Sequence, residues 1–144
     1  MEYHIPEFAE FDRWRGKRVL EIGGGICTTA SSFAQAGANI TIVELSPKSM
    51  ELCQQRFRAL GLYDRATFYV GNAENLSSVV PVQTYDLIWS FGVIHHSPNP
   101  ESIVAQIRQV EYLLCESILQ SRASDGIIHR THLTSRMPSV FDLH

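Results

Sequence analysis

Apolar positions along the chain follow two spacings. Short, nearly continuous apolar runs are typical of buried strands, and they occupy residues 17–23, 39–45, 66–71 and 85–91. Between these runs, apolar residues recur at the spacing of amphipathic helices, over residues 28–37 and 46–61 and from residue 99 onward. Strands that alternate with helices predict an α/β fold, in which helices cover both faces of a mainly parallel sheet.

Start and stop residues support these helices. Ser46 is suited to cap a helix that has Pro47 in its first turn, and Gly61 is suited to end it. A last helix is predicted to open at residues 99–100. Its apolar stripe consists of Ile103, Val104, Ile107, Val110, Leu114 and Ile118.

The stretch VLEIGGGICTTASSF, residues 19–33, runs from a strand through three glycines into a helix. Such a turn brings the backbone close to a nucleotide. Glu44 lies at the end of the second strand, where a carboxylate can accept hydrogen bonds from both ribose hydroxyls. The dinucleotide spacing Gly-x-Gly-x-x-Gly fails, because Thr28 occupies the sixth position from Gly23. Glu44 alone fits either NAD or S-adenosylmethionine.

Four motifs follow one another along the chain: VLEIGGG, VELSP, GNAENL and YDLIWSFGVIHHSPNPESIVAQIRQV. In this order they resemble class I S-adenosylmethionine-dependent methyltransferases, in the small-molecule branch of the ubiquinone and menaquinone biosynthesis type. The resemblance covers residues 6–110 and implies a Rossmann-like, doubly wound sheet. We expect a single methyltransferase-like domain over residues 1–144, of which residues 111–144 diverge from the family.

The resemblance implies S-adenosyl-L-methionine as cofactor. The glycine-rich loop would hold its methionine part, Glu44 its ribose and residues 72–74 its adenine, and residues 90–91 would lie beside the sulfonium. The implied cofactor-binding residues are Glu21, Gly23, Gly24, Gly25, Glu44, Leu45, Asn72, Ala73, Glu74, Ser90 and Phe91. His95 or His96 could accept a proton, although the favoured interpretation is that one packs in the core and the other meets solvent.

Cys27 stands where the family has its third glycine. We expect it to keep the loop's turn with a negative φ, to narrow and weaken the cofactor site, and to carry a thiol shielded by bound cofactor. The chain has three cysteines, Cys27, Cys53 and Cys115, which is an odd number, and they are widely spaced. A disulfide is therefore not expected, and a cytoplasmic location is expected. His129 and His132 have no evident third ligand, so no metal site is predicted.

The net charge of −3 and the pI of about 6.0 give no broad basic face for nucleic acid. No apolar run reaches the roughly 20 residues that span a bilayer. The expected partner is a small-molecule methyl acceptor.

The turn that usually follows this point in the family is missing after residue 110. Residues 126–133 can supply one strand at most, so the C-terminal strands are expected to be incomplete. The strand at residues 85–91 would then have an unpaired edge, open to self-association or to residues 126–133.

The sequence therefore favours a methyltransferase that acts on a small molecule, with an incomplete acceptor half. The reaction would be displacement at the sulfonium methyl by a nitrogen, oxygen, carbon or sulfur atom of the acceptor. Two alternatives stay open: a noncatalytic module that binds the cofactor or a partner, and an NAD-dependent oxidoreductase.

Overall fold

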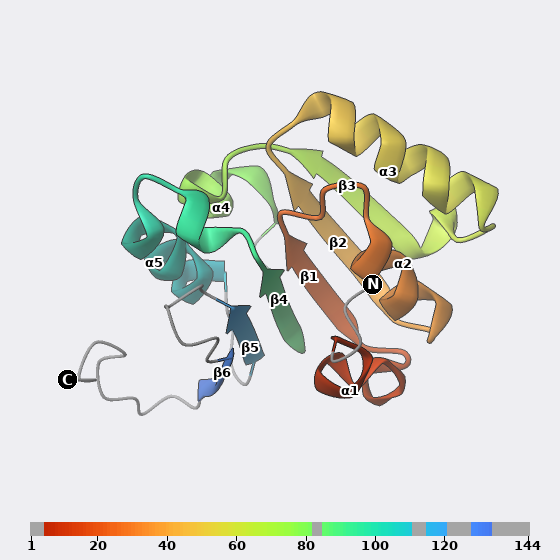
Figure 1. Ribbon diagram of the computed structural model, residues 1–144, viewed down its shortest axis with the longest axis horizontal. Helices are drawn as coiled ribbons and strands as arrows, with labels where there is room; N and C mark the ends of the chain where they lie inside the picture. The colour runs from red at the N-terminus through yellow and green to blue at the C-terminus, as the bar shows by residue number, and fades with distance from the viewer. Residues whose placement is uncertain (1–4, 82–84, 111–114, 121–127, 134–144) are drawn as a thin grey trace.

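A computed structural model describes residues 5–81, 85–110, 115–120 and 128–133 (Figure 1). The strands are β1 (Arg18–Ile22), β2 (Asn39–Glu44), β3 (Ala66–Val70), β4 (Leu87–Phe91), β5 (Cys115–Gln120) and β6 (Ile128–Leu133). The α-helices are α1 (Ile5–Ala9), α2 (Thr28–Gln35), α3 (Pro47–Ala59), α4 (Leu76–Val79) and α5 (Pro100–Val110). The short 3₁₀ turns are η1 (Phe11–Trp14), η2 (Tyr63–Arg65), η3 (Ala73–Asn75) and η4 (Ile94–His96).

The strands form one sheet in the order β3-β2-β1-β4-β5-β6. Strands β1 to β5 pair in parallel, and β6 runs antiparallel to β5. The strand order reverses beside β1, because β2 and β3 lie on one side of it and β4 lies on the other. This arrangement confirms the predicted Rossmann-like α/β fold, and it creates a switch point where sheets of this kind bind ligands.

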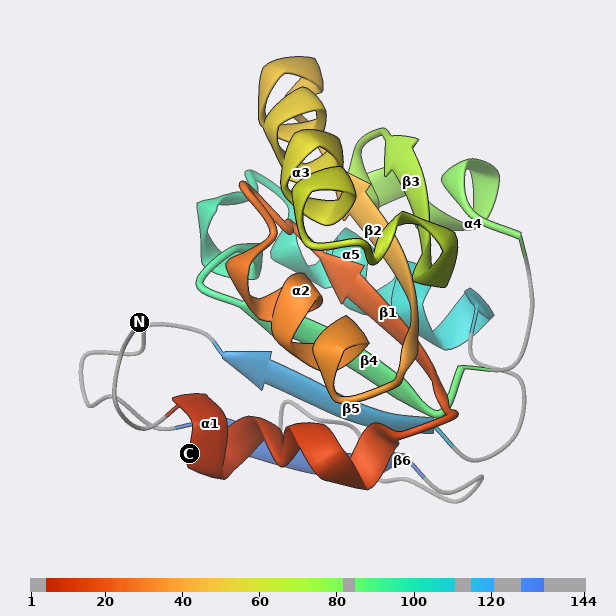
Figure 2. The same cartoon turned by 90° about the vertical axis from the view of Figure 1, so that its right-hand side faces the viewer.

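Helices cover both faces of the sheet (Figure 2). Side chains alternate along β1, so that Val19 packs in one apolar core and Leu20 in the other. The first core is closed by α1, α2 and α3, and it contains Phe33, Phe57 and Trp89. The second core is closed by α4 and α5, whose buried residues include Leu76 and Ile107.

The predicted start of α3 is confirmed in detail. The Ser46 hydroxyl accepts a hydrogen bond from the Ser49 backbone N–H at 3.2 Å, and Pro47 occupies the first turn. The cap at Ser46 lies two residues after Glu44, so α3 leaves the sheet directly after the end of β2.

The prediction for the C-terminal part was wrong in two respects. Helix α5 ends at Val110, and Ile118 belongs to β5, which pairs in parallel with β4; Leu114 lies outside the described residues. The tail also supplies two strands, because β6 pairs with β5 rather than with β4. The apolar stripe at helical spacing continues past Val110, which is why a helix was predicted. A strand is formed instead, because it gives the backbone groups along β4 hydrogen-bond partners on that side.

The expected unpaired edge on β4 is therefore absent. β4 pairs with β1 on one side and with β5 on the other.

Candidate functional site

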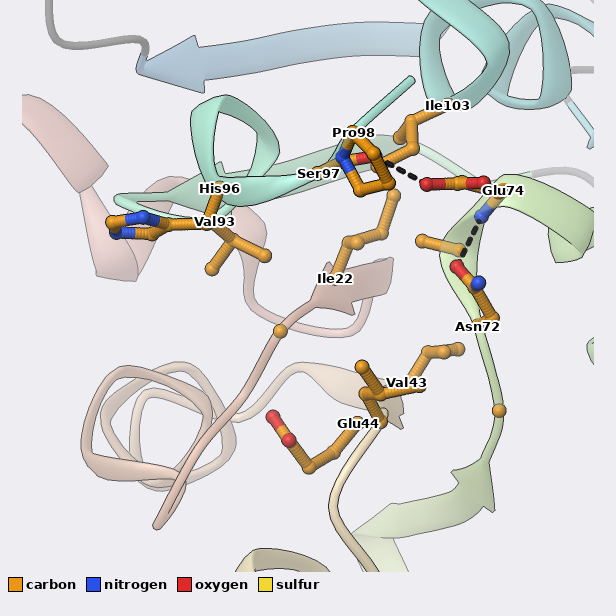
Figure 3. A pocket seen from close by; sticks show the side chains of 14 residues that line it. Ile22, Val43, Glu44, Asn72, Glu74, Val93, His96, Ser97, Pro98 and Ile103 are labelled. Atoms are coloured by element: carbon orange, nitrogen blue, oxygen red, sulfur yellow. Dashed lines mark hydrogen bonds between the residues drawn. The ribbon is translucent and has the colours of Figure 1, made fainter. Parts of the chain in front are cut away.

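A pocket of about 360 Å³ lies at the carboxyl ends of β1 to β4 and beside α5 (Figure 3). We call it the carboxyl-end pocket. Its lining consists of Ile22, Gly23, Val43, Glu44, Leu45, Gly71, Asn72, Ala73, Glu74, Val93, His96, Ser97, Pro98 and Ile103. These residues include two carboxylates and neither Lys nor Arg. The pocket thus favours a neutral or cationic ligand over one that carries phosphates.

Glu44 is the polar centre of the β2 side of this pocket. Its two carboxylate oxygens accept hydrogen bonds at 2.8 Å from the backbone N–H groups of Gly25 and Ser46. A carboxylate has about four lone-pair sites, so two stay available to a ligand's hydroxyl groups. Glu44 therefore both fixes the glycine-rich loop (residues 23–27) and presents an acceptor next to it.

Backbone hydrogen bonds attach the neighbouring loops to the end of β2. The N–H of Gly23 donates to the Val43 carbonyl oxygen at 2.8 Å, and the N–H of Gly71 donates to the Glu44 carbonyl oxygen at 3.0 Å. Gly23 has a φ of 75°, and a Cβ atom there would lie 2.4 Å from a Val93 methyl carbon. Glycine is needed at this position for its backbone conformation and because Val93 lies so close.

Asn72 and Glu74 form the opposite wall. The Asn72 side-chain oxygen accepts a hydrogen bond from the Glu74 N–H at 2.9 Å and caps η3. The Ser97 hydroxyl donates to the Glu74 carboxylate, which joins η3 to the segment between η4 and α5 (Figure 3). Ile22, Val43 and Ile103 make the surface between the two walls apolar.

Glu21 lies beneath the glycine-rich loop, outside the lining of the pocket. A Cβ atom on Gly24 would be 3.9 Å from its Oε2 atom, which is buried and has no hydrogen-bond partner among the described residues. Burial raises the pKa of Glu21 to about 8, and the charge of Glu44 adds to the rise, while a hydrogen bond from the Ala30 backbone opposes it. An unsatisfied buried oxygen of this kind fits a ligand that brings an ammonium group to the loop.

The other predicted site residues divide into two groups. Gly23, Glu44, Leu45 and residues 72–74 line the pocket, and Leu45 is 67% exposed at its rim. Gly24 and Gly25 belong to the loop but not to the pocket's lining.

Ser90 and Phe91 lie at the end of β4, outside the lining of the carboxyl-end pocket. Ser90 is fully buried, and its hydroxyl donates to the Ile22 carbonyl oxygen at 3.4 Å. Phe91 stacks on Trp89 in the first core, on the face of the sheet away from Ile22 and Ile103. Their position beside a cofactor's sulfonium stays a prediction.

The two adjacent histidines differ in position. Their ring centroids are 4.0 Å apart, but only His96 lines the carboxyl-end pocket. It sits at the end of η4, exposed to solvent and next to Val93 in the lining (Figure 3). If either histidine exchanges a proton with a ligand in this pocket, the geometry favours His96.

The interpretation of Cys27 was wrong. Its φ is +62°, in the left-handed region, and its side chain is fully buried and bonded to Cys53 in a disulfide. Both cysteines pack in the first core, so Cys27 is not a free thiol that faces a ligand. Sequence spacing could not show the pair, because 26 residues separate the two cysteines and the fold brings their Cα atoms to 5.1 Å.

The sequence interpretation missed seven residues that line the pocket: Ile22, Val43, Gly71, Val93, Ser97, Pro98 and Ile103. The last four follow the fourth strand, in the motif that includes the two histidines. Their position after a strand at the switch point was the available signal, and it does not reveal which side chains turn inward.

Neither a cluster of metal ligands nor a membrane-spanning helix occurs among the described residues. They contain no cluster of three or more potential metal ligands, although the side chains of His129 and His132 are not described. No helix among them has the length and apolar character to cross a bilayer.

The whole lining of the carboxyl-end pocket lies within a region shared with a known protein family. The profile of the Methyltransferase domain family matches residues 20–111, which is more than half of the chain and includes every residue in the pocket's lining.

Two similar curated proteins are named as methyltransferases. An uncharacterized methyltransferase of Mycobacteroides abscessus is 36% identical over 86 residues, which make up 60% of this chain and 32% of that protein. A ubiquinone biosynthesis O-methyltransferase of Azoarcus sp. (strain BH72) is 30% identical over 95 residues, 66% of this chain and 40% of that protein. The chain thus spans well under half the length of these curated relatives.

A solved structure shares the fold. The arsenic(III) S-adenosylmethionine methyltransferase from Chlamydomonas reinhardtii superimposes with a TM-score of 0.65 at 23% identity, over 73% of this chain and 38% of that one.

Proposed function

Because this chain belongs to the Methyltransferase domain family, we propose that it binds S-adenosylmethionine in the carboxyl-end pocket and transfers its methyl group to a small molecule. The observation that carries the proposal is the Glu44 carboxylate, which lies at the switch point beside the glycine-rich loop. The absence of Lys and Arg from the lining supports a sulfonium cofactor over NAD, whose pyrophosphate would face two carboxylates.

Each part of the cofactor has residues suited to hold it. Glu44 would accept the ribose hydroxyls, and the adenine would lie between the apolar surface and the wall formed by residues 72–74. The glycine-rich loop would hold the methionine part, with its ammonium near Glu21. S-adenosylmethionine supplies an activated methyl group, so the protein's own contribution is to orient the reactants and exclude water.

The acceptor is proposed to be a small molecule with a nucleophilic hydroxyl. The Azoarcus relative is named as an O-methyltransferase, which makes oxygen the first acceptor atom to test. His96 lines the pocket and could take the proton that the hydroxyl loses. A fall in kcat for His96→Ala with an unchanged cofactor Kd would support this role, and an unchanged kcat would exclude it.

Three wider expectations stay proposals. We propose that the chain is a single domain over residues 1–144, which the continuous sheet from β3 to β6 supports. We propose a cytoplasmic protein without a nucleic-acid or membrane partner. Self-association through a sheet edge would have to use β3 or β6, since β4 is paired on both sides.

Titration calorimetry with S-adenosylhomocysteine and with NAD tests the proposal. We expect binding of S-adenosylhomocysteine at one site per chain and no measurable heat with NAD. Binding of NAD alone would overturn the proposal.

Turnover is tested separately, with methyl-labelled S-adenosylmethionine and a panel of phenols and catechols. Cofactor binding without transfer to any acceptor would favour the noncatalytic binding module.

A further inference from the structure

The Cys27–Cys53 disulfide joins two segments that meet beside the carboxyl-end pocket. Cys27 is the last residue of the glycine-rich loop and the N-cap of α2. Cys53 lies in the middle of α3, the helix that follows Glu44. The bond therefore connects the loop after β1 to the helix after β2, across the end of the sheet where Glu44 holds Gly25.

The backbone of Cys27 needs such an attachment. With φ at +62° and ψ at +39° it adopts the left-handed conformation, which glycine takes freely and other residues take only at an energetic cost. This conformation lets its N–H donate to the Gly24 carbonyl oxygen at 2.7 Å. Its own carbonyl oxygen accepts from the Ser31 N–H at 3.0 Å, in the first turn of α2. The disulfide holds Cys27 where a glycine would need no constraint.

We propose that Cys27 and Cys53 form a reversible redox site, and that its oxidised form fixes the glycine-rich loop in the conformation that binds the cofactor. The effect on cofactor affinity rests on the function proposed above. A disulfide inside a protein of a reducing compartment is usually transient and redox-sensing, so the proposed cytoplasmic location agrees with a regulatory bond.

The reduction balances with a dithiol as reductant. One thiolate of the dithiol attacks a cysteine sulfur, the Sγ–Sγ bond breaks, and a mixed disulfide forms. The second thiol then displaces the protein sulfur. Two electrons and two protons pass to the protein, which gains two thiols, and the dithiol leaves as a cyclic disulfide.

The surface beside the bond offers a route to it. A shallow pocket of about 380 Å³ is lined by Ile26, Leu52, Gln55, Arg56 and Ala59. Ile26 is 48% exposed and Leu52 is 41% exposed, and these residues directly precede the two cysteines. The sulfurs are buried, but each cysteine directly follows a residue of this surface along the chain, so a local opening of the loop exposes the bond.

The redox site is tested first without any cofactor. Alkylation under denaturing conditions should add one label to the oxidised chain, at Cys115, and three after treatment with dithiothreitol. Backbone amides of residues 23–31 should exchange hydrogen faster in the reduced protein, by about fivefold, because Cys27 is released. Three labels under both conditions, or equal exchange rates, would overturn the proposal.

Cofactor affinity and two variants complete the test. Reduced protein should bind S-adenosylhomocysteine about 5- to 30-fold more weakly than oxidised protein, the fold-change that corresponds to the cost of about 1–2 kcal/mol for a left-handed non-glycine residue. Cys53→Ala should behave like reduced protein under both conditions. Cys27→Gly should bind like oxidised protein under both, because glycine adopts this φ without a covalent anchor. Equal affinity of the two redox forms would overturn the redox proposal but leave the proposed function intact. Redox-dependent exchange without binding in either form would overturn the proposed function alone.

Discussion

At the scale of single residues, the Glu44 carboxylate both stabilises the glycine-rich loop and faces the pocket. It accepts backbone hydrogen bonds from Gly25 and Ser46, and it faces the carboxyl-end pocket. Substitution should therefore affect both the loop and the ligand.

We predict that Glu44→Ala weakens binding of S-adenosylhomocysteine by about 1.5–3 kcal/mol, the range for hydrogen bonds to a charged group. Glu44→Gln should lose less, since it keeps one acceptor oxygen. Calorimetry measures the affinity, and thermal unfolding checks that the variants fold. Glu51→Ala is the control, because Glu51 is exposed on α3 and pairs with Lys48 away from the pocket. Unchanged affinity in a folded Glu44→Ala protein would remove Glu44 from the site.

Glu21 makes the stability of the protein depend on pH. Its pKa of about 8 in the folded protein exceeds the ordinary value of 4.5, which applies to the unfolded chain. Below pH 4.5 the carboxyl is protonated in both states. Between pH 4.5 and 8 only the unfolded chain releases the proton, so the free energy of unfolding falls as pH rises.

We predict that Glu21→Gln removes this dependence. The stability of the variant relative to the parent should grow between pH 5 and pH 8 by about 3 kcal/mol, and urea unfolding at several pH values measures it. Glu51→Gln should show no such growth, because its parent carboxylate is exposed. A stability difference for Glu21→Gln that is constant with pH would show that the proton is lost in both states alike.

At the scale of elements, the hydrogen bond from Ser97 to Glu74 joins η3 to the segment that leads into α5. Ser97→Ala should lower stability by about 1 kcal/mol and weaken cofactor binding several-fold, because one wall of the pocket is released. Ser77→Ala is a matched control: its hydroxyl donates to Gln106 at 2.7 Å and ties α4 to α5 outside the pocket. Equal losses of affinity in the two variants would show a general loosening instead.

Local patterns predicted the elements that depend on local chemistry. The Ser46 cap, the Pro47 start and the strand that ends at Glu44 all depend on neighbouring residues, and the structure confirms them. The strand β5 depends on pairing with the distant β4, and its sequence continues a helical stripe, so the pattern was misread. The resemblance located the end of β4, but it did not show which face of the sheet the Ser90 and Phe91 side chains take.

At the scale of the whole molecule, β5 covers the edge of β4 and carries β6 on its other side. Truncation after Val110 should expose the hydrogen-bonding groups along β4, which invite pairing with another chain. We predict that the truncated protein self-associates more strongly than the full chain in light scattering coupled to gel filtration. A truncated protein with the same oligomeric state as the full chain would show that β4 needs no neighbour.

Every described residue that lines the carboxyl-end pocket falls between Ile22 and Ile103, ahead of both C-terminal strands. The pocket is thus built by one uninterrupted stretch of the chain, and the last element of that stretch is α5. A recombination junction just after Val110 would exchange the C-terminal strands and leave the lining of the pocket unchanged, provided that the incoming segment supplies a strand for β4. The carboxyl-end pocket and the C-terminal strands can therefore diverge separately in evolution.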